Sequence, residues 1–373
     1  MSQRADLSRL RFPVAQSKGR RYPEPAHPYR DDFQRDRDRI IHARAFRRLE
    51  DKTQVFAAGI SDHFRNRLTH TIEVAQISRT LAVTLGLNEQ LTEALALAHD
   101  IGHPPFAHAG EDELDRQMRR FDDRFDHNLH ALRIVEIFEQ RYARFPGLNL
   151  TFEVREGIVK HSRDFEPGEN TAFDEYLPGF RPPLEAQLID LADEIAYNTA
   201  DLDDVFSAQL FTVEELAAAV PLFAGITEIV ETQFAGATER LKFLEALRAA
   251  IDLLVTGLVE GTAAAAQDAG VETVEDVRCF PRRLAMFTPG LRELNQQLKN
   301  FLRSRVYFSQ PLTDDREESA ARIAELFEFF IQDPSRLPAG YLDSGEPVHR
   351  QVCDYIAGMT DGYFRRIYHQ FLG

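Results

Sequence analysis

Apolar residues recur three and four positions apart along most of the chain, and few stretches alternate in the way that strands do. Between residues 67 and 85, Val74, Ile77 and Leu81 form one apolar stripe, and one turn earlier the same face carries His70. This spacing predicts a helix over residues 67–85 with His70 directed into the core. The pattern as a whole predicts an all-α protein.

A second helix is predicted to begin after Asn88, which is a good N-cap residue. Its core-facing positions are Leu91, Leu95 and Ala98. The helix runs into the adjacent pair His99 and Asp100 and is stopped by Gly102 and the two prolines that follow. Titratable side chains are therefore expected at the end of a core helix.

Further helices are predicted from near His108 and from near Asn128, the latter continuing as far as Tyr142. After a loop rich in Pro, Gly and Asp over residues 164–183, another helix opens with two prolines that suit a first turn. Its expected buried positions are Leu184, Leu188, Leu191 and Ile195. A second face carries Asp190, Asp193, Tyr197, Asp201 and Asp204, either as a solvated stripe or as the lining of a cavity.

Composition narrows the class of protein. The chain has 373 residues, 43% of them apolar, which suffices for one large domain or two moderate ones. Its formal net charge of −16 argues against general nucleic-acid binding. The two cysteines, Cys279 and Cys353, form no C-x-x-C pair, and we expect a cytoplasmic protein that spans no membrane. The arginine-rich segment 1–48 is either a solvated arm or a surface that faces phosphate or another subunit.

The stretch "LALAHDIGHPPFAHAGEDEL" over residues 95–114 concentrates the candidate chemistry, and seven of the twelve histidines fall between residues 63 and 130. Imidazole and carboxylate ligands hold the divalent metals that activate water. His70, His99, Asp100 and a carboxylate from the later helix would supply two neutral and two anionic ligands. Such a set neutralises a divalent ion and leaves two octahedral positions free.

Several motifs together resemble a known family. The segments "RNRLTHTIEVAQ", "LALAHDIGHPPFAHAGEDEL" and "LIDLADEIAYNTADLDD" carry an H…HD…D pattern. Supporting stretches are "DRDRIIHARAFRRLEDKTQVF", "FDHNLHALRIVEIFE", "EVREGIVKH" and "VCDYIAGMTD". The chain therefore resembles the HD-domain superfamily and, within it, the bacterial deoxyguanosinetriphosphate triphosphohydrolase-like branch of the dNTP triphosphohydrolases.

The resemblance implies an organisation for the chain. It implies an all-α fold in which a basic N-terminal segment (1–38) precedes an HD-domain core (39–210). Additional C-terminal helices (211–373) would pack on that core as part of the same structural unit.

The resemblance also implies the metal ligands, which would be His70, His99, Asp100 and Asp193. The residues alone leave Asp190 and Asp193 as alternatives, and the family places the ligand four residues before a tyrosine. Manganese, magnesium and iron(II) all suit this donor set.

Substrate contacts follow from the same resemblance. Gln54 and Asp201 would bind the sugar 3′-hydroxyl, so analogues without that hydroxyl should be rejected. Arg67, Lys160 and Tyr197 would contact phosphate, and the guanidinium of Arg67 suits that task.

His108 and Glu111 lie three residues apart at a helix start, where the carboxylate can orient the imidazole and stabilise its protonated form. The resemblance assigns this dyad to the chemical step, with His108 acting either as the base or as the nucleophile. His103 and His127 would approach the phosphates, where a protonated imidazole can assist the leaving group. His130, Asp112 and Glu113 have no role in the family pattern. Asp112 and Glu113 are expected to be solvated acids in the first turn of the helix.

The function implied is metal-dependent hydrolysis of deoxynucleoside triphosphates to deoxynucleoside and triphosphate, in control of the dNTP pool. Another HD-domain nucleotide phosphohydrolase and a catalytically idle nucleotide-sensing protein are the alternatives. The resemblance further implies a homo-oligomer, with a hexamer favoured, and a second dNTP as allosteric activator. Which dNTP is preferred stays open at this point.

Overall fold

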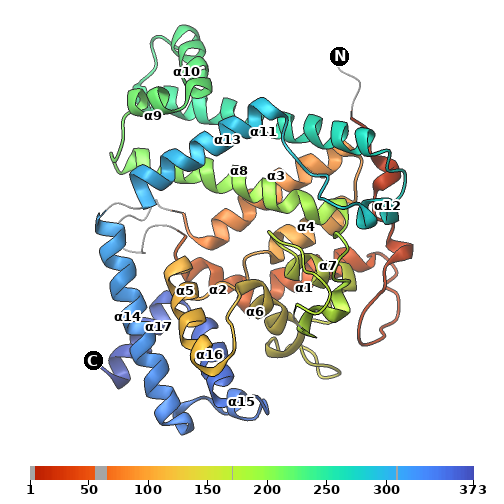
Figure 1. Ribbon diagram of the computed structural model, residues 1–373, viewed down its shortest axis with the longest axis vertical. Helices are drawn as coiled ribbons and strands as arrows, with labels where there is room; N and C mark the ends of the chain where they lie inside the picture. Colours follow the sequence, from red (N-terminus) through yellow and green to blue (C-terminus); the bar gives the residue numbers. More distant parts are fainter. Residues whose placement is uncertain (1–4, 55–64, 170, 308–309) are drawn as a thin grey trace. The chain divides into compact units, whose positions relative to one another are not determined.

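The computed structural model describes residues 5–54, 65–169, 171–307 and 310–373 (Figure 1). Within these residues every regular element is a helix, and the only extended pairings are two isolated bridges. The expected all-α fold is therefore confirmed. The chain divides into two compact units, within residues 1–18, 72–96 and 160–309 (unit 1) and within 19–71, 97–159 and 310–373 (unit 2). Neither unit follows the consecutive segments 1–38, 39–210 and 211–373 expected from the sequence.

Unit 1 is built around a long helix, α8 (Leu184–Ser207), which packs against α11 (Glu239–Ala269) and α13 (Pro289–Leu302). Its other helices are α9 (Val213–Ala219), α10 (Pro221–Gln233) and α12 (Val274–Cys279), together with most of α3 (Arg67–Leu85) and α4 (Glu89–Ala98). The predicted N-cap of α4 is confirmed, because the Asn88 side chain accepts a 3.1 Å hydrogen bond from the Leu91 backbone N–H.

The two faces of α8 both lie inside the protein. Leu184, Leu188 and Ile195 are buried as expected, and Leu191 is half-buried. On the acidic face, Asp201 and Asp204 are buried, and Asp190, Asp193 and Tyr197 are half-buried. The regular acidic stripe is thus not a solvated surface.

Helix α11 is the most apolar long element. Its length and composition alone would allow it to cross a membrane, although half of its most apolar 18-residue stretch is buried inside the structure. Core helices of globular units share these properties, and α11 packs against α8, α10 and α13.

Unit 2 carries α5 (Ala107–Met118), which packs against α14 (Gln310–Gln332) and α16 (Val348–Ala357). Its other helices are α1 (Asp32–His42), α2 (Arg44–Arg48), α6 (His127–Arg133), α7 (Phe152–Val159), α15 (Ala339–Leu342) and α17 (Asp361–Phe371). The apolar core of this unit includes Phe106, Leu114, Phe327, Phe330, Val352 and Phe364. Residues more than 200 positions apart thus share one core.

The helix predicted to reach Tyr142 ends earlier. Helix α6 stops at Arg133 and continues as a π-helical turn, Ile134–Phe138. The Val135 carbonyl accepts a 2.6 Å hydrogen bond from the Leu148 backbone N–H, which diverts it from the helical ladder. The helix therefore ends where the segment around Leu148 returns to contact it. The apolar spacing within the helix gives no sign of this contact.

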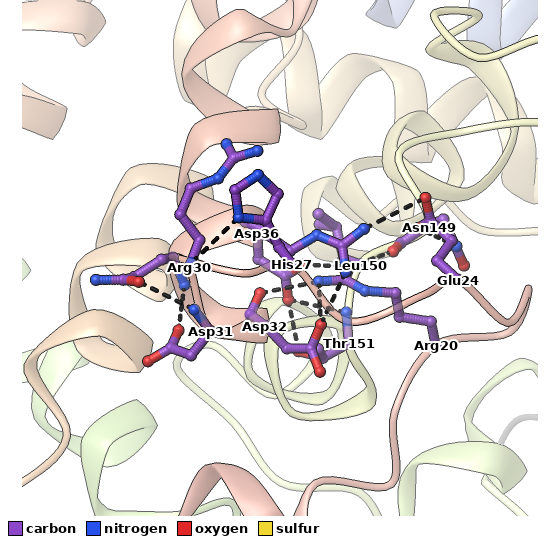
Figure 2. Close-up of polar contacts among 12 residues, drawn as sticks. Arg20, Glu24, His27, Arg30, Asp31, Asp32, Asp36, Asn149, Leu150 and Thr151 are labelled. Atoms are coloured by element: carbon purple, nitrogen blue, oxygen red, sulfur yellow. Dashed lines mark hydrogen bonds and ion pairs between the residues drawn. The ribbon is translucent and has the colours of Figure 1, made fainter.

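Residues 20–39 of the arginine-rich N-terminal segment are largely neutralised within unit 2 (Figure 2). Arg20 Nη1 donates to Asp36 Oδ1 at 2.5 Å, and the other carboxylate oxygen of Asp36 accepts hydrogen bonds from the Thr151 N–H and hydroxyl at 2.9 and 2.6 Å. Arg39 pairs with Glu24 at 2.7 Å. These arginines therefore fix residues 20–39 to the rest of the unit and do not form a solvated arm.

The buried ion pair between Asp36 and Arg20 leads to a prediction about stability. Asp36 is fully buried and the Arg20 side chain is 5% exposed, so Asp36→Asn leaves a buried guanidinium poorly compensated. We expect a loss of about 3 kcal/mol in the free energy of unfolding, measured by urea titration. The control is Asp38→Asn on the same helix, whose pairs with Arg30 and Arg37 are partly exposed and contribute at most about 1 kcal/mol. Equal losses in the two variants would contradict the assignment.

Candidate active site

A buried cluster of metal-ligating groups forms where α3 begins and α4 ends. His70 lies in the first turn of α3, and His99 and Asp100 directly follow the last residue of α4. Their exposed fractions are 1%, 2% and 4%, and one ligand atom of each lies within 4.8 Å of the others. Ligand atoms at about 2.1 Å from an ion are up to about 4 Å apart, so these three side chains fit a divalent metal with only small rotations. The inward direction predicted for His70 is confirmed.

The Asp100 carboxylate is held by a guanidinium on one side and an imidazole on the other. Arg67 Nη1 donates to Asp100 Oδ2 at 2.7 Å, and His103 Nδ1 lies 2.9 Å from Oδ1. Burial on its own would raise the pKa of Asp100, but Arg67 and the neighbouring imidazoles outweigh it and hold that pKa well below its usual value. The carboxylate is therefore ionised, as a metal ligand must be.

The turn from His99 to His108 needs a glycine and a strained backbone. A Cβ on Gly102 would lie 2.0 Å from the His127 carbonyl oxygen, so only glycine allows the start of α6 to approach this closely. As a result the rings of His103 and His127 lie 4.0 Å apart between centroids. Just before α5, Phe106 and Ala107 both have positive φ angles, 62° and 52°.

One buried carboxylate holds this strained turn. Asp361, at the start of α17, accepts a 3.1 Å hydrogen bond from the Phe106 N–H and a 2.9 Å bond from the Thr53 N–H. Thr53 also forms a bridge with Asn66, directly before Arg67. Asp361 thus connects the turn before α5 to the segment that leads into α3.

Gln54 follows Thr53 and is placed by the same contacts. Its side-chain oxygen is buried and has no hydrogen-bond partner among the described residues. An unpaired buried acceptor of this kind is available to a ligand. The last two residues of the "KTQVF" motif, Val55 and Phe56, lie outside the described residues.

A second cluster at the start of α5 comprises His103, His108 and Glu111, with ligand atoms within 4.8 Å of one another. His127 Nδ1 lies 2.6 Å from Glu111 Oε1, whereas His108 Nδ1 lies 3.9 Å from Oε2. Burial alone would raise the pKa of Glu111, but the contacts with His108 and His127 lower it far more. Glu111 is therefore an ionised carboxylate shared by two imidazoles, and its closer partner is His127, not the His108 of the expected dyad.

The protonation of His103 differs from the expectation that it could act as a protonated imidazole. Burial, Arg67 and His127 together lower its pKa well below the usual value, against the opposing effect of Asp100. His103 is therefore neutral in the unliganded protein. Of the two imidazoles expected near the leaving group, His127 is the one left as a candidate proton donor.

Unit 1 contributes a separate group along α8. Asp190 is engaged by three groups: His161 Nδ1 at 2.7 Å, the Ser162 N–H at 2.9 Å, and Arg283. Asp193, one turn further, lies 3.8 Å from His161 Nε2 and its side chain is 21% exposed. The close partners of Asp190 suit a structural role, which favours Asp193 as the residue that acts on a ligand.

Other predicted site residues on and near α8 already form contacts within the protein. Burial and the nearby carboxylates raise the pKa of Tyr197, so its phenol stays neutral and can donate a hydrogen bond. Asp201 accepts a short hydrogen bond from the Tyr307 hydroxyl. Lys160 Nζ donates to the carbonyls of Leu177 and Phe180 at 2.9 and 2.8 Å, which holds the loop before α8. The phosphate role of Lys160 stays a prediction.

Sequence reasoning missed several residues at these sites. Asp361 and His161 belong to the "VCDYIAGMTD" and "EVREGIVKH" motifs, so a signal was present without a role attached to it. Glu113, expected to be solvated, is 5% exposed and accepts hydrogen bonds from Gln117 and Arg116, whereas Asp112 is exposed as expected. Glu113 therefore supports the inner face of α5.

Comparison with known proteins gives consistent results. The HD domain matches residues 67–198, and a phosphohydrolase-associated domain matches residues 285–370. A deoxyguanosinetriphosphate triphosphohydrolase-like protein of Geobacter sulfurreducens is 43% identical over 99% of this chain and 97% of its own length. Proteins of the same name from Azoarcus sp. and Ralstonia nicotianae are 47% and 45% identical, over 96% and 94% of this chain and 94% and 90% of their own lengths.

The helical fold, the buried histidine and aspartate cluster and the domain matches define an HD-domain phosphohydrolase. Within that class, the chain belongs to the family of deoxyguanosinetriphosphate triphosphohydrolase-like proteins. HD domains bind divalent metals, which agrees with the ligand cluster of unit 2.

The geometry predicts that metal binding requires His99 and does not require His108. His99→Ala removes one of three clustered ligands, so we expect tight Mn²⁺ binding to be lost in isothermal titration calorimetry. His108→Ala is the control, because His108 belongs to the second cluster and its side chain is 77% exposed. Mn²⁺ binding that survives His99→Ala, or that disappears equally in both variants, would contradict the assignment.

Proposed function

We propose that this protein hydrolyses deoxynucleoside triphosphates to deoxynucleoside and intact triphosphate, and that it acts in the cytoplasm on the dNTP pool. One observation carries the proposal. A buried set of metal ligands and a carboxylate shared by two imidazoles lie at the two ends of one short turn, residues 99–108. The names of the relatives, which carry the suffix "like", support the same reaction class.

In this proposal His70, His99 and Asp100 hold a divalent ion, manganese or magnesium by preference, and iron(II) is a further candidate. Asp193 completes the set, an assignment that rests on the H…HD…D pattern of the sequence. When bound, such an ion supplies Lewis acidity toward a phosphate oxygen. The ionised state of Asp100, set by Arg67 and the imidazoles around it, favours the binding of a cation there.

The chain's own residues would bind and orient the substrate. Arg67 presents a guanidinium that now donates to Asp100 and can also donate to a phosphate oxygen. His103 is neutral and buried beside it, so it can donate one hydrogen bond without a charge. Tyr197 and Lys160 are the further phosphate contacts proposed from the family pattern.

Recognition of the sugar is assigned to Gln54 and Asp201. The buried, unpartnered oxygen of Gln54 would accept the one hydrogen bond that a 3′-hydroxyl can donate, and the carboxylate of Asp201, which already accepts from Tyr307, would lie against the same hydroxyl. A nucleotide without this hydroxyl would leave the buried oxygen of Gln54 without a donor.

His108, Glu111 and His127 would carry the proton transfers. His108 is exposed at the start of α5, where it can act as the base or as the nucleophile. Glu111 orients His127 through a 2.6 Å contact and stabilises a positive charge on either imidazole. His127 is then the residue proposed to protonate the departing 5′-oxygen.

The proposed reaction can be tested directly. Purified protein incubated with each dNTP and Mn²⁺ or Mg²⁺ should release triphosphate and deoxynucleoside in equal amounts, detected by ion-exchange chromatography. Release of pyrophosphate or phosphate instead would identify a different HD-domain phosphohydrolase. Binding of dNTP without hydrolysis would identify a nucleotide-sensing protein.

The proposed activator is tested by repeating the assay in the presence of a second dNTP. The proposed hexamer is tested by measuring the molar mass of the oligomer by light scattering.

His108→Ala tests the chemical step separately from the metal. We expect kcat to fall by about 10²-fold or more while the bound metal is retained, because general acid–base catalysis contributes on that order. Asp112→Asn on the same helix is the control, since Asp112 is exposed and belongs to neither cluster. A kcat within a factor of about two of the parent protein in His108→Ala would remove His108 from the mechanism.

A further inference from the structure

A cavity in unit 2 is not used by the proposed function. It has a volume of about 230 Å³ and is open at one side. Its walls come from α2, the π-helical turn after α6, and the chain around α15 and α16. The titratable side chains that line it are Arg44, Arg48, Lys52, His130, Glu139 and Asp354, together with Tyr341. All of these residues belong to the same unit.

The cavity contains a buried imidazole with unmet hydrogen-bonding capacity. His130 is 2% exposed, and neither ring nitrogen has a hydrogen-bond partner among the described residues. Its Nδ1 lies 3.5 Å from Asp354 Oδ1, which leaves Nε2 on the opposite side of the ring. Burial lowers the pKa of His130, so the ring is neutral and can offer one N–H to a ligand. Buried polar groups without partners are rare in proteins and call for an explanation.

The charges that face the cavity sum to a positive value. Arg44, Arg48 and Lys52 line it, and two acids, Glu139 and Asp354, oppose them. Asp354 is already paired with Arg133 at 2.6 Å. Glu139 accepts a 2.7 Å hydrogen bond from the Ala45 N–H, and its other oxygen lies 3.9 Å from Arg44 Nε.

Lys52 is the deepest of the three cations. It is 4% exposed and donates to the carbonyls of His103 and Ala357. Burial lowers the pKa of Lys52 to about 7, so the amine is only partly protonated near neutral pH, and an anion bound beside it would favour the charged form. At the rim, Arg48 Nη1 donates to the Gly358 carbonyl at 3.0 Å, which fixes a guanidinium that has further donors.

We propose that this cavity is a binding site for a small phosphate-type anion such as inorganic phosphate or pyrophosphate. Two guanidinium groups, a buried ammonium and an imidazole N–H are donors that suit phosphate oxygens. Pockets for drug-sized ligands measure about 300–1,000 Å³, so a cavity of about 230 Å³ fits a small anion better than a whole nucleotide. The proposal does not depend on the proposed function.

The site is connected to the candidate active site through the chain. Ile101, which lies between Asp100 and Gly102, forms part of the cavity wall, and Lys52 donates to the His103 carbonyl. An anion that draws on Lys52 therefore acts on the turn that carries the metal ligands. Occupancy of the cavity should change the affinity of the protein for Mn²⁺.

The test measures binding of inorganic phosphate and of pyrophosphate to the metal-free full-length protein by isothermal titration calorimetry, at constant ionic strength set with chloride. We expect saturable binding that weakens about tenfold or more in Arg48→Gln and in Arg44→Gln, because each loses charge-assisted hydrogen bonds. Arg47→Gln is the matched control, since Arg47 lies on the same helix, α2, and does not line the cavity. The imidazole NMR signals of His130, assigned with His130→Asn, should shift on titration.

Three results would overturn the proposal. The first is the absence of saturable binding of either anion to the parent protein. The second is binding that is lost in His103→Ala but unchanged in Arg44→Gln and Arg48→Gln, which would place the anion in the candidate active site. The third is equal weakening in Arg47→Gln and Arg48→Gln, which would show non-specific attraction.

Discussion

The buried carboxylate of Asp361 is the contact on which the geometry of unit 2 depends. It is 1% exposed and accepts hydrogen bonds from the backbone of Thr53 and of Phe106, two segments that carry Gln54 and the start of α5. Phe106 has a positive φ, which costs free energy in a residue with a side chain. The charge-assisted hydrogen bond that the Phe106 N–H donates to Asp361 offsets that cost. The C-terminal helix α17 is therefore part of the site, although it carries none of the residues assigned to the chemistry.

Local charge, and not the net charge of −16, determines what unit 2 can bind. Around Asp100 the guanidinium of Arg67 and the imidazole of His103 lie within 3 Å of the carboxylate oxygens. The buried guanidinium is tolerated because the carboxylate compensates its charge, and in the proposed function it would become available to phosphate if a metal took over that carboxylate. The arginines of residues 20–39, by contrast, are paired with acids of their own unit and contribute little to an outward field.

The sequence predicted those features that depend on neighbours within one or two helical turns. The bounds of α3, the inward direction of His70 and the N-cap of Asn88 are of this kind, and each is confirmed. Features that depend on contacts between distant segments were missed or misjudged. Glu113 was expected in solvent because its burial depends on how α5 packs against α14 and α16. The role of Asp361 could not be derived, because its partners lie 255 and 308 residues away.

The placement of Glu111 changes how the chemical step is understood. A carboxylate that bonds to a single imidazole fixes one base, and the spacing of His108 and Glu111 suggested that arrangement. In the structure Glu111 is closer to His127, and the His108 ring extends from the start of α5 with its Nδ1 3.9 Å away. Glu111 therefore holds the imidazole proposed as the acid more closely than it holds His108, the residue proposed to act on phosphorus. Because a lowered pKa keeps Glu111 ionised, it can stabilise a positive charge on whichever imidazole carries the proton, without taking that proton itself.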